Sequence, residues 1–363
     1  MNPDVIVVGA GPAGTSAAIR LARSGRSVRL YEKAYFPRKK LCGGFLSPEA
    51  LTDLEDLSVL DSLKKIGAWP IHRMVIASRQ STTVESTLST PALSITRDVL
   101  DELLLQQAIQ AGVDVHMGTD GFQQKDISDY RVIAAGRQSY RREHEKIKQL
   151  TPWYARSSDE YFGMQAFFED VPTVTDQVEL DLITSGYVGL SRVTPSRVNV
   201  CTLTTRKTIN QWGPSLDCVL YHFMNENPVL RNHLQGSKRV GEWISVGPVE
   251  LGIRRLTQDR TFYVGDAACV VDPFAGEGMS IGLYTSQLLI GALNQKKYPP
   301  QKAYEQSWRQ AFLPALCWNG VMRGFYSCGI FREPILRSLR YFPQGLQWLS
   351  DLTRYRTIES VAL

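Results

Sequence analysis

The chain has 363 residues, of which 43% are hydrophobic and 21% charged, and its formal net charge is +5. This composition is typical of a globular protein with a substantial core, and no run approaches the roughly 20 apolar residues that a membrane-spanning helix needs. We expect no nucleic acid partner, because the basic residues accompany no nucleic-acid-binding module. Six widely spaced cysteines without a CxxC pair predict reduced thiols and no bound metal.

The N-terminal part shows a strand, a turn, a helix and a second strand. An apolar run from Asp4 to Val8 is followed by a glycine-rich turn, a helical pattern that ends at Gly25, and a second apolar run from Ser27 to Tyr31. This order predicts two parallel strands joined by a helix. Because Gly9, Gly11 and Pro12 break the apolar stretch from Val5 to Ala13, it does not resemble a secretory signal, and we expect a cytoplasmic location.

The rest of the chain alternates between helical and extended patterns. One helix is expected after Ser47, which would cap it, and a longer one over 98–111. Between Tyr161 and about Val240, strands separated by Gly, Pro, Asp and Ser predict an antiparallel sheet inserted into the first domain. Further strands are expected near 74–77, 82–87, 113–116, 131–135 and 261–264, and a further helix from about 278 to 293.

The first turn reads Gly9-Ala10-Gly11-Pro12-Ala13-Gly14, the GxGxxG pattern of dinucleotide-binding folds. Gly9 permits the tight turn, Gly11 leaves room for a pyrophosphate, and Gly14 lets the helix pack closely against the strand. Glu32 closes the second strand, 23 residues after Gly9, where its carboxylate can accept hydrogen bonds from ribose hydroxyls. An acidic residue there disfavours a ribose phosphate, so the pattern predicts FAD or NAD rather than NADP.

A late segment points to FAD. Residues 261–279 read TFYVGDAACVVDPFAGEGM, which resembles the GD motif and DPxxGEG extension of flavin monooxygenases of the para-hydroxybenzoate hydroxylase superfamily. The resemblance implies that Asp266 binds the ribityl chain and that Pro273 to Met279 line the isoalloxazine, with a helix N-terminus favouring the anionic reduced flavin. Arg97 matches the superfamily arginine that contacts FAD, and the strand before Gly136 resembles the one that usually reads AxGxxS, with Ser139 in the serine position.

A second loop narrows the family. Residues 36–51 read FPRKKLCGGFLSPEAL and resemble the CGG loop of the geranylgeranyl reductase family, flavoenzymes that saturate isoprenoid double bonds. The loop cysteine of these reductases lies near flavin and substrate, so Cys42 is the candidate catalytic residue; the alternative is a small buried side chain. Reductases of membrane lipids carry a YxWxFP-like strand. This chain has Tyr187 at the tyrosine position of that strand and Gly189 at the tryptophan position. Both are candidate substrate residues. The WxWxIP signature of flavin halogenases is absent. No lysine of this chain matches the halogenase lysine that relays hypohalous acid.

These resemblances predict an α/β protein with a Rossmann-like FAD-binding domain, of the glutathione reductase and para-hydroxybenzoate hydroxylase type. We expect that domain over 1–70, 95–160 and 245–310, an inserted antiparallel substrate domain over 71–94 and 161–244, and a helical C-terminal segment over 311–363. The predicted cofactor-binding residues are Gly9, Gly11, Ala13, Gly14, Glu32, Lys33, Gly43, Gly44, Arg97, Gly136, Asp266, Pro273, Gly276, Gly278 and Met279.

The expected function is an FAD-dependent oxidoreductase that uses NAD(P)H to reduce a hydrophobic, isoprenoid- or polyketide-like substrate. The chain has no second nucleotide fingerprint, so NAD(P)H would dock transiently. One alternative is an FAD-dependent monooxygenase that hydroxylates an aromatic or polyketide substrate, and another is a non-catalytic flavin-binding protein. The sequence leaves the reaction, the choice between NADH and NADPH, and the oligomeric state open.

The C-terminal segment has its own pattern. From Trp318 to Leu352, aromatic and aliphatic residues alternate with arginines. Such a segment can lie on a membrane surface, roof an apolar cavity, or form helices that pack on the flavin domain and expose their arginines. A peripheral membrane contact is therefore one expectation for this segment.

Overall fold

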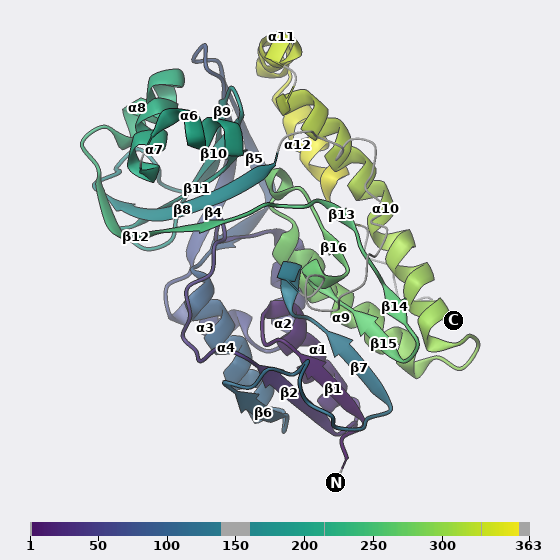
Figure 1. Ribbon diagram of the computed structural model, residues 1–363. Helices are drawn as coiled ribbons and strands as arrows, with labels where there is room; N and C mark the ends of the chain where they lie inside the picture. Colours follow the sequence, from purple (N-terminus) through teal and green to yellow (C-terminus); the bar gives the residue numbers. More distant parts are fainter. Residues whose placement is uncertain (1, 139–159, 214, 328, 356–363) are drawn as a thin grey trace.

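The computed structural model describes residues 2–138, 160–213, 215–327 and 329–355, which fold around two large sheets with helices along one side (Figure 1). The first sheet has the strand order β14-β15-β7-β1-β2-β6, and every pairing is parallel except that of the edge strand β14. Its strands are β1 (Val5–Val8), β2 (Val28–Glu32), β6 (Asp114–Met117), β7 (Tyr130–Ile133), β14 (Thr257–Gln258) and β15 (Thr261–Tyr263). This arrangement confirms the predicted Rossmann-like fold.

Helices cover this sheet and supply most of its core. All residues of β1 are buried, as expected for a central strand of a parallel sheet. The helix α1 (Pro12–Arg23) packs against α4 (Arg97–Gln110) and α9 (Gly278–Asn294), while α2 (Pro48–Asp56) packs on α9 and α3 (Leu60–Lys65) follows it. Ser47 is the N-cap residue of α2, as predicted, but its hydroxyl makes no capping hydrogen bond to the first turn and is buried beside Glu277.

The second sheet has the order β12-β8-β11-β10-β9-β4-β5-β3. It was expected to be purely antiparallel, but β4 and β9 pair in parallel, because they come from separate segments and no hairpin joins them. Its strands are β3 (Phe45–Leu46), β4 (Trp69–Ala77), β5 (Thr83–Ser94), β8 (Tyr161–Glu169), β9 (Gln177–Ile183), β10 (Gly186–Arg192), β11 (Val198–Thr205) and β12 (Lys238–Val246). Because β3 follows the CGG loop directly, that loop passes from one sheet to the other.

The two faces of the second sheet have different coverings. One face packs against α7 (Leu216–Glu226) and α8 (Pro228–Leu234), which follow α6 (Arg206–Trp212). The other face contributes Leu180 and Leu182 to a cluster shared with the C-terminal helices. The side chains of β9 alternate accordingly, since Glu179 faces α8 and bonds to His233.

The C-terminal part consists of α10 (Pro300–Ser327), α11 (Gly329–Tyr341) and α12 (Pro343–Thr353). Its helices begin at Pro300, earlier than the expected boundary at 311, and α10 spans both sheets along one side of the molecule (Figure 1). A short pair, β13 (Gly252–Ile253) and β16 (Cys269–Val270), lies beside α9. Of the helices described, none is both long and apolar enough to cross a membrane.

Candidate active site

Two cavities form a continuous trough from the strand ends of the first sheet to the second sheet. The first, of about 350 Å³, lies at the ends of β1 and β2, and we call it the nucleotide cavity. The second, of about 290 Å³, lies between the sheets, and we call it the inner chamber. Both cavities are lined by Gly11, Lys40, Leu41, Ala134, Arg137, Val246 and Asp266. A trough outside the carboxyl ends of parallel strands is the usual ligand position in such folds.

The glycine turn shapes the start of the trough. A Cβ on Gly14 would lie 1.8 Å from the carbonyl oxygen of Gly9, so only glycine lets α1 approach the turn this closely. Gly9 has a φ of +104°, and a Cβ there would lie 2.6 Å from the carbonyl oxygen of Ala134. Gly11 faces the trough instead, where a Cβ would lie 3.7 Å from a nitrogen of Arg97. The positive end of α1 therefore opens onto the trough, where Gly11 has no side chain of its own to block a phosphate and Arg97 lies nearby.

Glu32 is fixed in the wall of the nucleotide cavity. Its carboxylate is buried and accepts hydrogen bonds from the backbone N–H groups of Ala10, at 2.8 Å, and Ala34, at 3.0 Å. Arg38 lies 3.8 Å from the same carboxylate. The predicted ribose-binding carboxylate is thus held in place by the glycine turn itself.

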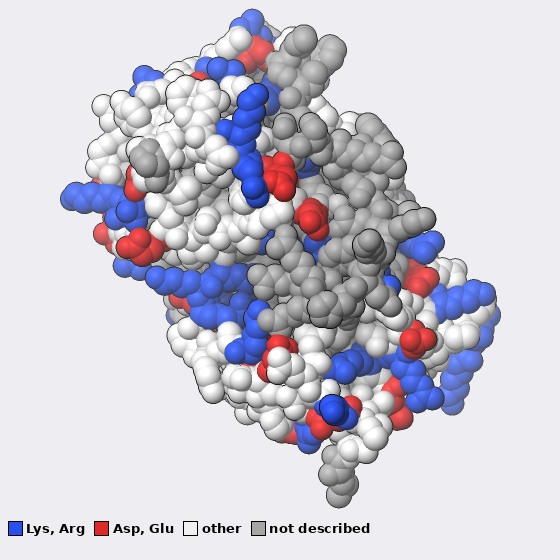
Figure 2. All heavy atoms as spheres, in the orientation of Figure 1, with Lys and Arg blue, Asp and Glu red and all other residues white. Residues whose placement is uncertain are grey.

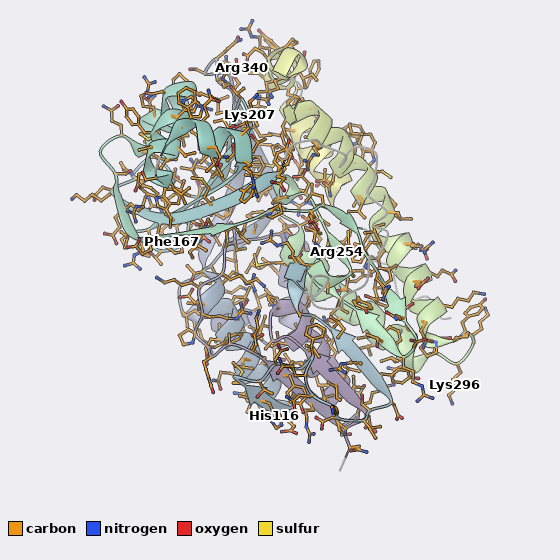
Figure 3. The ribbon with its side chains drawn as sticks, viewed as in Figure 1. His116, Phe167, Lys207, Arg254, Lys296 and Arg340 are labelled. Atoms are coloured by element: carbon orange, nitrogen blue, oxygen red, sulfur yellow. The ribbon has the colours of Figure 1, made fainter. Side chains whose placement is uncertain are left out.

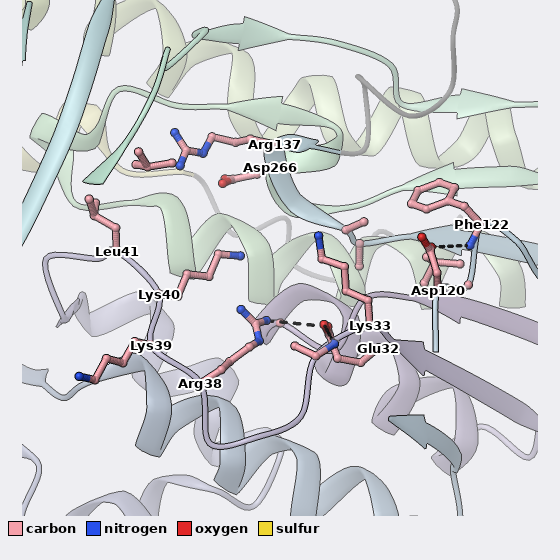
Figure 4. A pocket seen from close by; sticks show the side chains of 18 of the residues that line it. Glu32, Lys33, Arg38, Lys39, Lys40, Leu41, Asp120, Phe122, Arg137 and Asp266 are labelled. Atoms are coloured by element: carbon pink, nitrogen blue, oxygen red, sulfur yellow. Dashed lines mark hydrogen bonds and ion pairs between the residues drawn. The ribbon is translucent and has the colours of Figure 1, made fainter. Parts of the chain in front are cut away.

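Cations surround the junction of the two cavities. Figure 4 shows the charged ends of Lys33, Arg38 and Lys40 turned toward the open space, whereas Lys39 points away from it. Burial, together with the charges of Arg97 and Arg38, lowers the pKa of Lys40 to about 8. Figure 2 shows basic side chains gathered at the waist between the two sheets. This concentration of positive charge suits the pyrophosphate of a dinucleotide.

The CGG loop forms one wall of the inner chamber and is held by the second sheet. Cys42 donates its backbone N–H to the side chain of Gln165, at 3.0 Å, and its carbonyl oxygen accepts a bond from Asn199, at 2.8 Å. The Ser191 hydroxyl donates to the carbonyl oxygen of Gly43 at 2.9 Å. The Cys42 sulfur faces the chamber 3.8 Å from the sulfur of Met279. Three strands of the substrate sheet therefore fix the position of this thiol.

The DPFAGEG segment forms the opposite wall and is held by α10. The buried Asp272 carboxylate accepts hydrogen bonds from the Tyr326 hydroxyl, at 2.6 Å, and from Arg323, at 3.1 Å. Phe274 stacks on Tyr326 with ring centroids 4.7 Å apart, and Tyr187 meets both rings edge-on. The C-terminal helix thus positions both the segment expected to line the isoalloxazine and the candidate substrate tyrosine.

A buried carboxyl group lies behind this wall. Glu277 precedes α9 and is bonded to the Ser280 hydroxyl at 2.6 Å, with Arg354 3.5 Å away. Burial raises the pKa of Glu277 to about 7, and the opposing charge of Arg354 lowers it by less than burial raises it. The Glu277 carboxyl group therefore gains or loses its proton near neutral pH. It lies at the N-terminus of α9, which borders the chamber.

The outer part of the chamber is apolar. Gly189 and its cross-strand partner Cys201 form part of its floor, and burial raises the pKa of Cys201 to about 12, so this thiol stays protonated. Tyr187 is buried in the wall, and its hydroxyl has no hydrogen-bond partner among the described residues. The apolar lining consists of Met74, Leu88, Val178, Leu180, Leu203, Val246, Val249 and Phe274.

The trough brings the predicted residues together. Of the predicted cofactor residues, all but Gly14 line one of the two cavities, as do Cys42, Tyr187 and Gly189. The lining fits FAD, because a Cβ on Gly43 or Gly278 would enter open space and the cations lie where a pyrophosphate would. Ser139 lies outside the described residues.

Sequence reasoning did not single out several residues of this site. These are Arg38, Lys40, Asp101, Gln165, Ser191 and Asn199. The i,i+4 spacing of Arg97 and Asp101 was a usable signal for a helical ion pair. The other contacts join segments far apart in the sequence, and no local pattern marks them.

The comparisons agree with this site. Residues 4–145 match the family model described as FAD dependent oxidoreductase. The chain is 25% identical over 397 residues to a menaquinone reductase of Mycobacterium tuberculosis, covering 98% of this chain and 88% of that protein. A triple mutant of the flavin-dependent brominase Bmp2 superposes with a TM-score of 0.80 at 16% identity, over 99% of this chain and 96% of that one. A geranylgeranyl bacteriochlorophyll reductase-like protein of Thermoplasma acidophilum superposes with a TM-score of 0.75 at 18% identity. The match covers 98% of this chain and 94% of that one.

The match of residues 4–145 to the FAD dependent oxidoreductase model, taken with the fold and the lining of the trough, indicates an FAD-dependent oxidoreductase. The prediction of an FAD enzyme is thereby confirmed. The geranylgeranyl reductase group is only one of several among the relatives, which also include menaquinone reductases and flavin-dependent halogenases.

Proposed function

We propose that this protein is an NAD(P)H-dependent reductase of a hydrophobic substrate with an isoprenoid chain, such as a prenylated quinone. The observation that carries the proposal is the inner chamber, whose outer part is apolar and whose wall holds the Cys42 thiol beside Met279. Menaquinone reductases match nearly the whole chain, which supports a prenylated substrate. Bound FAD would supply hydride transfer from the nicotinamide to the substrate.

The chain's own residues would bind and orient the two ligands. Arg38 and Lys40 would hold the pyrophosphate, and Glu32 the ribose. The apolar lining would exclude water from the substrate. The hydroxyl of Tyr187 points to a role as hydrogen-bond donor to a substrate oxygen, because burial and the Asp272 charge raise its pKa well above the ordinary value and keep it protonated. Overall, a hydride from NAD(P)H and a proton would add to the substrate.

Oxygenation or halogenation is the second candidate. The same apolar chamber would keep water away from oxygen chemistry, and the amino group of Lys40 reaches its cofactor end. The two candidates differ in the mass of the product. Incubation of the FAD-loaded protein with NADPH, bromide, oxygen and a short-chain prenylated quinone is expected to add two hydrogen atoms. A product that has gained oxygen or bromine would overturn the proposal in favour of the second candidate.

Cys42 and Cys201 form a matched pair for testing the wall of the chamber. Both thiols line it, but only Cys42 faces Met279. Cys42→Ala is expected to lower kcat by about tenfold or more without changing FAD content, whereas Cys201→Ala changes kcat by less than about threefold. Equal effects of the two substitutions would show that Cys42 acts only by filling space.

A further inference from the structure

The corner between α11 and α12 concentrates exposed apolar side chains. Tyr341 is 82% exposed, Phe342 72%, Trp348 59% and Ile335 38%. These four, which we call the C-terminal corner, are a third of the twelve large exposed hydrophobic side chains in the described part of the chain. Single exposed hydrophobics are ordinary, but a cluster marks a contact surface.

The corner also has a groove. A shallow cavity of about 260 Å³ on α11 is lined by Pro334, Ile335, Ser338, Leu339 and Phe342. It offers almost only apolar groups, and it is open enough to receive a hydrocarbon chain from outside. Its lining overlaps the corner at Ile335 and Phe342.

Positive charge accompanies these apolar groups. Of the four arginines in residues 332–354, Arg332 is buried and Arg354 is paired and only 12% exposed, so Arg337 and Arg340 supply the exposed positive charge. Arg337 pairs with Glu333 at 3.2 Å, while Arg340 is exposed and has no ionic partner within the described residues. Figure 3 places Arg340 beside α11, at the end of the molecule far from the first sheet. Tyr, Trp and Arg together are typical of surfaces that lie at a membrane interface.

The corner adjoins an opening into the inner chamber. A small cavity between β5 and α12 shares Met74, Leu88, Ser350 and Arg354 with the chamber. On its outer side it is lined by Gln347, the neighbour of Trp348. The small cavity shares no lining residue with the nucleotide cavity, so it marks a separate side of the chamber, next to α12.

We propose that the C-terminal corner docks on a membrane surface containing anionic phospholipid. A hydrophobic substrate would then enter the chamber from the bilayer, between β5 and α12; this second step rests on the proposed function. The aromatic rings would insert at the level of the headgroups, and Arg340 would face lipid phosphates. A second copy of the chain fits less well, because a twofold contact through this patch would bring like-charged arginines together.

The test is vesicle flotation of the FAD-loaded protein. The wild type is expected to float with vesicles of phosphatidylcholine and phosphatidylglycerol, and more weakly with phosphatidylcholine alone. The triple variant Tyr341→Ser, Phe342→Ser, Trp348→Ser should lose binding by about tenfold or more. A matched control, Ile109→Ser, Ile127→Ser, Tyr221→Ser, removes exposed side chains elsewhere and should bind like the wild type.

A second pair of variants tests how far positive charge contributes to membrane binding. Arg340→Glu is expected to weaken binding to anionic vesicles several-fold, whereas Lys238→Glu, at an 80% exposed lysine of β12, should not. Wild-type protein that floats with neither vesicle, or a triple variant that still floats, would overturn the docking proposal. Light scattering that finds a wild-type dimer and a monomeric triple variant would also overturn it, in favour of self-association.

Failure of this proposal and of the proposed function can be told apart. A short-chain, water-soluble quinone bypasses the membrane, so the triple variant should reduce it as fast as the wild type does. If neither protein reduces it but the wild type floats, the reductase assignment fails and the docking surface stands. If both reduce it but neither floats, only the docking surface fails.

Discussion

The Arg97 guanidinium and the Asp101 carboxylate are joined by two hydrogen bonds, of 2.7 and 2.9 Å, in the first turn of α4. Both side chains are buried, and Arg38 lies 3.6 Å from the same carboxylate. Asp101 therefore aims Arg97 at the glycine turn, although it does not itself line the trough. Asp101 therefore affects FAD binding only by positioning Arg97.

This relationship predicts the effect of removing the carboxylate. Asp101→Ala leaves the buried Arg97 without its carboxylate partner and should lower the free energy of unfolding by about 3–5 kcal/mol, with weaker FAD binding. Glu102→Ala, which removes an exposed bond to Gln106 on the same helix, should cost less than about 0.5 kcal/mol. Urea unfolding and flavin titration measure both. An Asp101→Ala protein as stable as the control would show that the pair does not hold this helix.

The glycine turn gives a second prediction. Gly14→Ala places a methyl group 1.8 Å from the Gly9 carbonyl oxygen, so α1 must move away and FAD binding should be lost. Gly291→Ala, in the exposed part of α9 with open space around it, should instead stabilise the protein by about 0.5–1 kcal/mol. Thermal unfolding and flavin content report the two outcomes. FAD retained at full stoichiometry in Gly14→Ala would contradict the assigned role of the turn.

Lys40 should make FAD binding depend on pH. Its ammonium is charged below its pKa of about 8 and neutral above it, so FAD affinity should fall as the pH rises through that value. Lys40→Met should bind FAD about tenfold more weakly at pH 7 and show no such step. Lys39→Met serves as the control, because that side chain points away from the cavity (Figure 4). A pH step that persists in Lys40→Met would assign the titration to another group.

Glu277 predicts a pH dependence of stability. Its folded pKa of about 7 lies above the ordinary value of 4.5, so the folded state holds the proton more tightly between these values. The resulting stability is complete below about pH 4.5 and is lost as the pH rises to about 7, a change of roughly 3 kcal/mol. Glu277→Gln cannot titrate and should not show that loss. Unfolding curves at pH 5 and pH 7.5 compare the two proteins, and parallel changes in both would rule out Glu277 as the source.

The local motifs were predictable from the sequence. The GxGxxG turn, Glu32 at the end of β2 and the helix after the DPFAGEG segment each depend on residues close together in the chain. Backbone geometry fixes such motifs wherever they occur, because a tight turn without side chains needs glycine at fixed spacings. The first sheet and most of the cofactor lining follow from them.

The supports of the site could not be predicted in the same way. Gln165 and Asn199 hold the Cys42 loop across 123 and 157 residues, and Tyr326 reaches Asp272 across 54. A polar residue in a strand gives no sign of its distant partner before the sheet forms. The parallel pairing of β4 with β9 was missed for the same reason, since it depends on the path between two separated segments.

The most direct test of the central claim is the anaerobic stoichiometry of the reaction. The FAD-loaded protein is mixed with NADPH, and separately with NADH, and a short-chain prenylated quinone in the absence of oxygen, and the oxidised nicotinamide and reduced product are counted. A reductase consumes one reduced nicotinamide for each substrate molecule reduced, with Cys42→Ala slow in the same assay. If nicotinamide oxidation stops at one equivalent per bound FAD until oxygen is admitted, the protein is not a reductase of this substrate and the chamber serves oxygen chemistry instead.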